Sequence, residues 1–62
     1  MNAQELKSKL ESYSLEEIAQ NYEEFNPEFF NGNYEIPTTL DGWVEQIIED
    51  INSNEYLFED IF

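Results

Sequence analysis

Carboxylates recur every four residues in the second half of the chain, at Asp41, Glu45 and Glu49. If this stretch is helical, the three side chains form one stripe, because residues four apart lie on the same side of a helix. Successive members are then about 6 Å apart along the axis, from a rise of about 1.5 Å per residue. Neighbouring phosphates on one strand of nucleic acid have a comparable spacing. The stripe therefore has the chemistry to pair with Lys and Arg side chains that normally hold phosphates.

Further acidic residues extend this negative surface onto other predicted helices. They are Glu16, Glu17, Glu23, Glu24, Asp50, Glu55, Glu59 and Asp60. We predict that these eight residues and the stripe form the partner-binding set of the protein. A run of charge is ordinarily a solvated face, but a surface that serves only solubility mixes both signs of charge. Here the cations are almost missing, which favours a basic partner.

The balance of charge is the strongest constraint on function. The chain has 62 residues, with 15 Asp and Glu, two Lys and no Arg or His, and a net charge of −13. The two cations, Lys7 and Lys9, lie near the start, and 13 of the acidic residues lie in 12–62. Self-repulsion of this kind lowers the stability of the compact state. It also excludes direct binding to nucleic acid and to anionic membranes, because almost nothing is present to neutralise phosphates.

Catalysis, a metal centre and a cofactor are not expected. Without His or Cys the chain has no imidazole base, no thiolate nucleophile, no disulfide and no thiolate metal site. Paired carboxylates can still perform acid–base chemistry. Here, however, the pairs fall on exposed faces of short predicted helices, in a chain with little room for a cleft. We therefore expect a protein that is not an enzyme.

One segment resembles part of a calcium-binding loop. Asp50–Asn54 matches the start of an EF-hand loop, D-x-N-x-N. The sixth loop position, normally Gly, is Glu55, and the twelfth, normally a bidentate Glu, is Ile61. The favoured interpretation is a polar break between two helices, with no metal site.

Four helical signals position these side chains. In the first, Asn2 is a good N-cap with Glu5 three residues later. Two oppositely charged pairs at i,i+4 are expected on this helix, Glu5–Lys9 and Lys7–Glu11, which makes it close to neutral and suggests a scaffold role. Its apolar residues recur at helical spacing, at Leu6, Leu10 and Tyr13.

The second helix has a capping box formed by Ser14 and Glu17. It presents an apolar stripe made of Leu15, Ile18, Ala19, Tyr22 and Phe25. Pro27 ends it, since the residue before proline avoids helical geometry, and can start a single further turn that Gly32 stops. The stretch Asn31–Thr38 is predicted to be an extended loop that holds Tyr34 and Ile36 on the core. Strand pairing across a homodimer is the alternative.

The third helix begins at a cap formed by Thr38 or Thr39. Its apolar face comprises Leu40, Trp43, Val44, Ile47, Ile48 and Ile51. A break at 52–54 and a short last helix are expected to follow. Residues 55–62 mix acidic and large apolar groups, which fits either a terminal helix closing the core or an acidic interaction segment of the activation type. The core interpretation is favoured, because a small domain needs these apolar groups.

The chain is thus predicted to be a single domain, residues 1–62, with an all-α fold of three to four short helices in a small bundle. High net charge usually indicates disorder. The five Phe, four Tyr and one Trp oppose that interpretation, because aromatic side chains dominate core energetics. No apolar run approaches the length that spans a bilayer and no signal peptide is recognised, so a cytoplasmic location is expected.

In its size, its lack of Cys and its acidic stripes, the chain resembles the DNA-mimic proteins encoded by phages and plasmids. That group holds anti-restriction proteins, anti-CRISPR proteins and uracil-DNA glycosylase inhibitors. The stretch from Leu40 to Phe62 is similar to acidic helices of phage anti-restriction proteins. The resemblance implies a cytoplasmic protein of the host cell that blocks a host defence nuclease or DNA-processing enzyme.

The leading hypothesis is therefore an acidic mimic of nucleic acid that occupies the basic channel of a nucleic-acid-binding protein. Exposed aromatic residues such as Tyr34 or Tyr56 would add contact area. The alternative is a binding module for another basic protein, such as an antitoxin-like neutraliser or a transcription regulator. Both functions need only a negative surface, and the sequence does not separate them.

Overall fold

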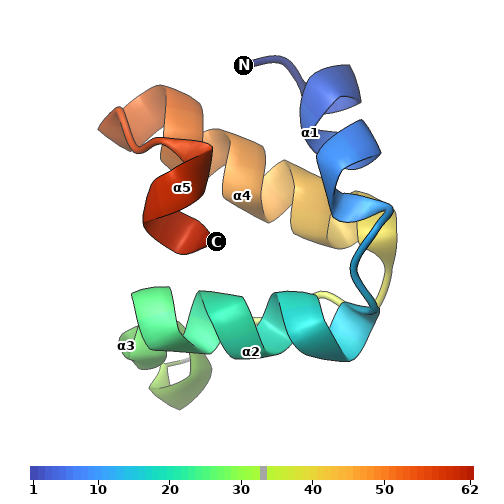
Figure 1. The fold of residues 1–62 in the computed structure, drawn as a ribbon. Coiled ribbons are helices and arrows are strands. Elements are labelled where there is room, and N and C mark those ends of the chain that lie inside the picture. The colour runs from blue at the N-terminus through green and yellow to red at the C-terminus, as the bar shows by residue number, and fades with distance from the viewer. Residues whose placement is uncertain (33) are drawn as a thin grey trace.

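Five helices follow one another in this computed structural model, which describes residues 1–32 and 34–62 (Figure 1). They are α1 (Ala3–Leu10), α2 (Leu15–Phe25), α3 (Pro27–Asn31), α4 (Leu40–Asn54) and α5 (Phe58–Ile61). The predicted all-α fold is confirmed. The structure has one helix more than expected, because the single turn that starts at Pro27 forms a separate helix, α3.

The predicted N-caps set the starts of the three longer helices. The Asn2 side chain accepts a hydrogen bond from the Glu5 backbone N–H (2.8 Å). Ser14 and Glu17 form the full capping box of α2, with bonds of 3.1 and 3.0 Å. Of the two candidates for α4, Thr39 is the cap, and its hydroxyl accepts from the Gly42 N–H (3.1 Å). Each bond satisfies a backbone donor that the helix itself leaves free.

The helix ends differ from the prediction at α4. The helix continues through 52–54, where a break was expected, and stops at Glu55, which has left-handed backbone geometry with φ 59°. The polar residues 52–54 are exposed, so they continue the last turn without burying a polar group. The interpretation of Asp50–Asn54 as a polar break is therefore wrong. A helical segment also cannot curl around an ion, so the resemblance to an EF-hand loop has no structural counterpart.

Each of the five helices contributes to one hydrophobic core. Its buried residues are Leu6, Leu10, Ile18, Tyr22, Phe29, Trp43, Val44, Ile47, Ile51 and Ile61. Helix α1 packs on α4, and α2 packs on α3 and α5 (Figure 1). The radius of gyration is 10.7 Å. A compact chain of this length should have about 10.6 Å, so the fold has the dimensions of an ordinary small domain.

An aromatic cluster forms the centre of this core. The Tyr22 ring lies 5.1 Å from Phe29 and 5.3 Å from Trp43, between ring centroids, and Phe25 and Phe30 complete its surroundings. These rings come from α2, α3 and α4. Large aromatic side chains bury much apolar area per residue, which is how a 62-residue chain without disulfides fills a core.

The segment after α3 is extended, as predicted, from Tyr34 to Pro37. Asn31, expected to begin the loop, is the last residue of α3 instead, and Asn33 lies outside the described residues. Ile36 is half-buried against the core. Tyr34 stacks on the buried ring of Phe29 but stays 67% exposed, so it is held against the core without being buried in it.

The C-terminal segment follows the core interpretation in α5. Ile61 is buried, and Phe58 and Phe62 pack beside it. The Phe62 ring lies 5.0 Å from Tyr13 and 4.9 Å from Phe58. Tyr56 and Leu57, between α4 and α5, do not join the core and are 41% and 63% exposed. In the described part of the chain, no helix combines the length and the apolar character needed to cross a bilayer.

We expect the melting temperature to rise with added NaCl. Repulsion among carboxylates opposes folding, and screening shortens its range from about 30 Å at 0.01 M salt to about 10 Å at 0.1 M. Circular dichroism melts between these concentrations measure the effect. A variant with Glu16, Glu23 and Glu24 replaced by Gln should melt higher at low salt and respond less to salt. A melting temperature that is independent of salt in the wild-type protein would show that the repulsion is already offset.

Candidate functional site

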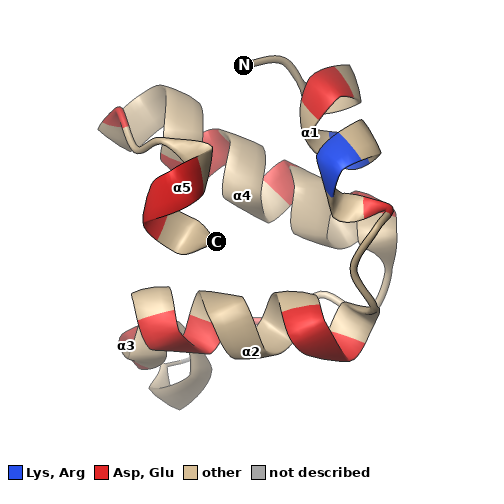
Figure 2. Ribbon diagram, in the orientation of Figure 1, with Lys and Arg blue, Asp and Glu red and all other residues tan. Residues whose placement is uncertain are grey.

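The negative charge lies almost entirely on the surface. Of the 15 acidic residues 14 are exposed, and only Asp50 is half-buried. Figure 2 shows acidic positions on every helix, whereas basic positions occur on α1 alone. Helices α2 to α5 therefore carry acidic side chains and no basic side chain of their own.

Both lysines contact other parts of the protein. Lys7 Nζ lies 3.1 Å from an Asp41 carboxylate oxygen, which ties α1 to the start of α4. Lys9 Nζ lies 5.1 Å from the centroid of the Phe58 ring in α5. The expected pairs Glu5–Lys9 and Lys7–Glu11 are not among the ion pairs of the described residues, so that prediction is wrong. The reason is tertiary, because the fold brings Asp41 of α4 within reach of Lys7 and the Phe58 ring of α5 near Lys9.

This ion pair changes the predicted stripe on α4. Asp41 is exposed, but its charge is partly offset by Lys7. Glu45 and Glu49 are exposed, and no ion pair or hydrogen bond among the described residues engages their side chains. The negative charge of the stripe that is not offset by a cation is therefore concentrated at Glu45 and Glu49.

Asp50 is the one half-buried member of the predicted set, and its side chain bonds to a core residue. Its carboxylate accepts a hydrogen bond from the Tyr22 hydroxyl (2.5 Å), and that hydroxyl accepts one from Gln46 Nε2 (3.2 Å). Burial and the bond to Asp50 raise the pKa of Tyr22 to about 12. Asp50 thus satisfies the polar end of the central aromatic ring. It remains half-buried and lines a surface hollow, so its role in partner binding stays a prediction.

The raised pKa of Tyr22 predicts a loss of stability in strong base. The folded protein holds this proton up to about pH 12, whereas an unfolded tyrosine releases it near its ordinary value of 10.0. The contribution is fully present below pH 10 and falls as pH rises from 10 to 12, because the unfolded state then binds fewer protons. Urea unfolding at several pH values measures this loss. Tyr22→Phe should lose less stability over the same interval. If the variant and the wild type lose equal stability, the loss arises from other titrating groups.

Two other members of the predicted set, Glu17 and Asp60, have a structural role as well, because they cap helices. A Glu17 carboxylate oxygen accepts from the Ser14 N–H (3.0 Å), and Asp60 accepts from the Leu57 N–H (2.8 Å) at the start of α5. Both side chains stay exposed. Their charge still contributes to the surface, but substituting either one would also weaken a helix start.

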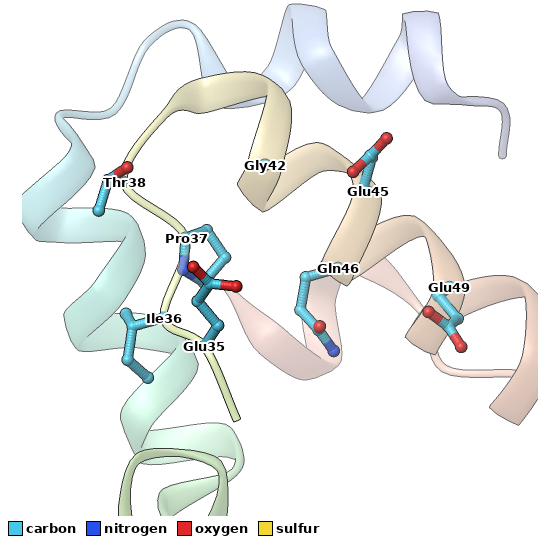
Figure 3. Close-up of a pocket in the computed structure, with 8 residues that line it drawn as sticks. All are labelled: Glu35, Ile36, Pro37, Thr38, Gly42, Glu45, Gln46 and Glu49. Atoms are coloured by element: carbon cyan, nitrogen blue, oxygen red, sulfur yellow. The ribbon is translucent and has the colours of Figure 1, made fainter. Parts of the chain in front are cut away.

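A hollow of about 350 Å³ lies between α4 and the extended segment before it (Figure 3). Glu45 and Glu49 project from successive turns of α4, while Glu35 and Gln46 extend into the space between the segment and the helix. Glu35 was not predicted as a site residue. Helical spacing could not have predicted its position, because Glu35 lies in the loop before α4. Only the folded structure brings it to the same hollow as the α4 carboxylates.

A second hollow, of about 590 Å³, adjoins the first and shares Gln46 and Glu49 with it. Its lining adds Glu28 of α3, another acidic residue that the sequence did not single out, and the exposed ring of Tyr34. Together the two hollows bring carboxylates from α3, the extended segment and α4 to one side of the molecule.

The remaining acidic residues of the set line neither hollow. They are Glu16, Glu23, Glu24, Glu55 and Glu59, and all are exposed. On these side chains the described residues make no hydrogen bond or ion pair. They contribute to the overall field but form no hollow with the α4 carboxylates.

The polar groups around the hollows are carboxylates, side-chain amides and hydroxyls, and they lie beside the exposed ring of Tyr34. Such groups accept hydrogen bonds and attract cationic side chains, which agrees with a surface for a basic partner. Comparison of the chain with protein-family models, with curated proteins and with solved structures found no match. The functional argument therefore depends on the chemistry of this surface.

Proposed function

We propose that the protein is an acidic mimic of nucleic acid. It binds the basic nucleic-acid-binding surface of a host defence nuclease or DNA-processing enzyme in the cytoplasm of the host cell and inhibits it competitively. The protein itself performs no catalysis and needs no cofactor.

The exposure of the carboxylates is the observation that supports this proposal. A folded surface carries 14 exposed acidic residues, and both lysines lie on α1, one of them in an ion pair. Uncompensated charge of one sign weakens a small fold. It is useful against a partner whose positive surface attracts phosphates, because complementary potentials speed association and exclude other partners.

The mechanism is substitution of carboxylates for phosphates. Glu45 and Glu49 sit one helical turn apart, about 6 Å along the axis. Glu28 and Glu35 lie beside them, and the carboxylates of α2 extend the field. Lys and Arg of the partner that would neutralise phosphates pair with these groups instead, and the substrate is kept out of its channel.

Competition with nucleic acid tests the proposal. The immobilised protein is incubated with host lysate, and the bound proteins are eluted at constant ionic strength with duplex DNA, with RNA or with poly-glutamate of matched charge. We expect a nucleic-acid-binding protein that DNA or RNA elutes well and poly-glutamate elutes poorly. The purified partner should then fail to form a ternary complex with the protein and its nucleic acid.

A stable ternary complex would overturn the mimicry mechanism. The protein would then be a binding module for a basic protein that acts away from the nucleic-acid channel, as an antitoxin-like neutraliser or a transcription regulator does. Equal elution by poly-glutamate and by nucleic acid would show non-specific attraction and would also contradict the proposal.

A further inference from the structure

The exposed ring of Tyr34 is fixed in place beside the second hollow. It stacks on Phe29 with 5.3 Å between centroids and 16° between ring planes. Phe29 is buried and in turn contacts Tyr22 of the core, so one face of Tyr34 rests on a rigid support. The residue is nevertheless 67% exposed, which leaves much of its surface accessible to a partner.

The absence of a side chain at Gly32 leaves room for the Tyr34 ring in this position. A Cβ atom at residue 32 would lie 3.0 Å from Cδ2 of the Tyr34 ring, closer than side chains normally approach. A larger residue would therefore require the ring to shift by a few tenths of an ångström. The requirement for glycine here is one of space, since its backbone is extended, with φ −95°.

Three features around this ring attract positive charge. Glu28, Glu49 and Asp50 line the same hollow, although Asp50 is already bonded to Tyr22. The hollow also reaches Ser53 and Asn54 in the last turn of α4. The carbonyl end of a helix carries partial negative charge, and α4 has no basic residue in its last turn to offset it. The face of the tyrosine ring is itself electron-rich.

We propose that this hollow receives an arginine side chain of the basic partner, with the guanidinium stacked on Tyr34 and paired with Glu28 or Glu49. The inference rests on the proposed function and specifies the chemistry of its partner. Arginine fits better than lysine because its planar group stacks on aromatic faces, sheds water more readily and forms paired hydrogen bonds with carboxylates. Lysine can also place its charge over an aromatic face, but it neither stacks as a plane nor forms paired hydrogen bonds with a carboxylate.

Two peptides of equal charge, hexa-arginine amide and hexa-lysine amide, test the proposal by calorimetric titration and ¹⁵N chemical-shift mapping. We expect the wild-type protein to bind the arginine peptide about threefold to tenfold more tightly, the range of an aromatic–cation contact. The shifts that differ between the peptides should centre on residues 28–35. Tyr34→Phe should keep the preference, because it keeps the ring.

Tyr34→Leu should remove the preference for arginine while weakening binding of the lysine peptide much less, since the net charge is the same and lysine does not stack on the ring. Tyr56→Leu is the matched control, because it removes another exposed tyrosine outside this hollow, and it should keep the preference. Equal affinity of the wild-type protein for the two peptides would overturn the inference, and so would a preference that survives in Tyr34→Leu. This outcome is independent of competition with DNA, so failure of the mimicry mechanism would be recognised separately.

Discussion

Reversing the charge of Glu45 and Glu49 together should slow association with the basic partner by about tenfold or more at low salt, because long-range attraction sets the rate of encounter. Both residues are exposed, off the apolar face of α4 and beside Glu35. The double variant Glu45→Lys/Glu49→Lys should therefore keep its helix content. Stopped-flow or surface-based kinetics with the partner captured by the protein measure the rate, and circular dichroism checks the fold.

The matched control is Glu5→Lys/Glu11→Lys, which changes the net charge equally but places the new lysines on α1, beside Lys7 and Lys9. It should slow association much less. Asp41 is left unchanged in both variants, because reversing it would break its ion pair with Lys7 and confuse packing with binding. If the two variants slow association equally, only the total charge matters, and the assignment of the site to α4 is wrong.

Ile47→Ala should leave the protein largely unfolded at 25 °C. Ile47 has no exposed surface, and truncating such a residue to alanine costs about 2–5 kcal/mol. A core in a chain of this size supplies only about 3–5 kcal/mol of net stability. The loss should appear as a collapse of the helical circular dichroism signal. Fluorescence of Trp43, the single and buried tryptophan, should shift towards that of an exposed indole.

Leu57→Ala is the control for this experiment, because it removes a large apolar side chain that is 63% exposed. It should change the free energy of unfolding by no more than about 0.5 kcal/mol. A folded Ile47→Ala protein with a melting temperature close to that of the wild type would contradict the packing described for α4.

The sequence determined much of the local structure. Asn2, Ser14 and Thr39 each offer a side-chain oxygen to a free backbone N–H, so the starts of α1, α2 and α4 depend only on neighbours within three residues. The apolar faces follow from helical periodicity in the same way. The excess of negative charge, and its exposure at nearly every carboxylate, follow from composition, because an unpaired charge is costly to bury.

The helix ends and the roles of single carboxylates were decided by the tertiary structure. Helix α4 ends at Asn54, three residues later than predicted, because residues 52–54 continue an exposed last turn beyond the buried Ile51. Asp41, Asp50 and Glu49 look alike in the sequence. In the fold, Asp41 pairs with Lys7, Asp50 accepts a bond from Tyr22, and Glu49 faces the hollows.

The same holds for the residues that spacing did not find. Glu28 and Glu35 precede and follow the stacked pair Phe29 and Tyr34, and they share hollows with α4 residues only because of the way the segments fold together. Periodicity relates residues within one helix, whereas these residues come from separate segments that only the fold brings to the same hollows. Composition and spacing therefore establish that the protein presents a negative surface, and packing of distant segments decides which carboxylates a partner can meet.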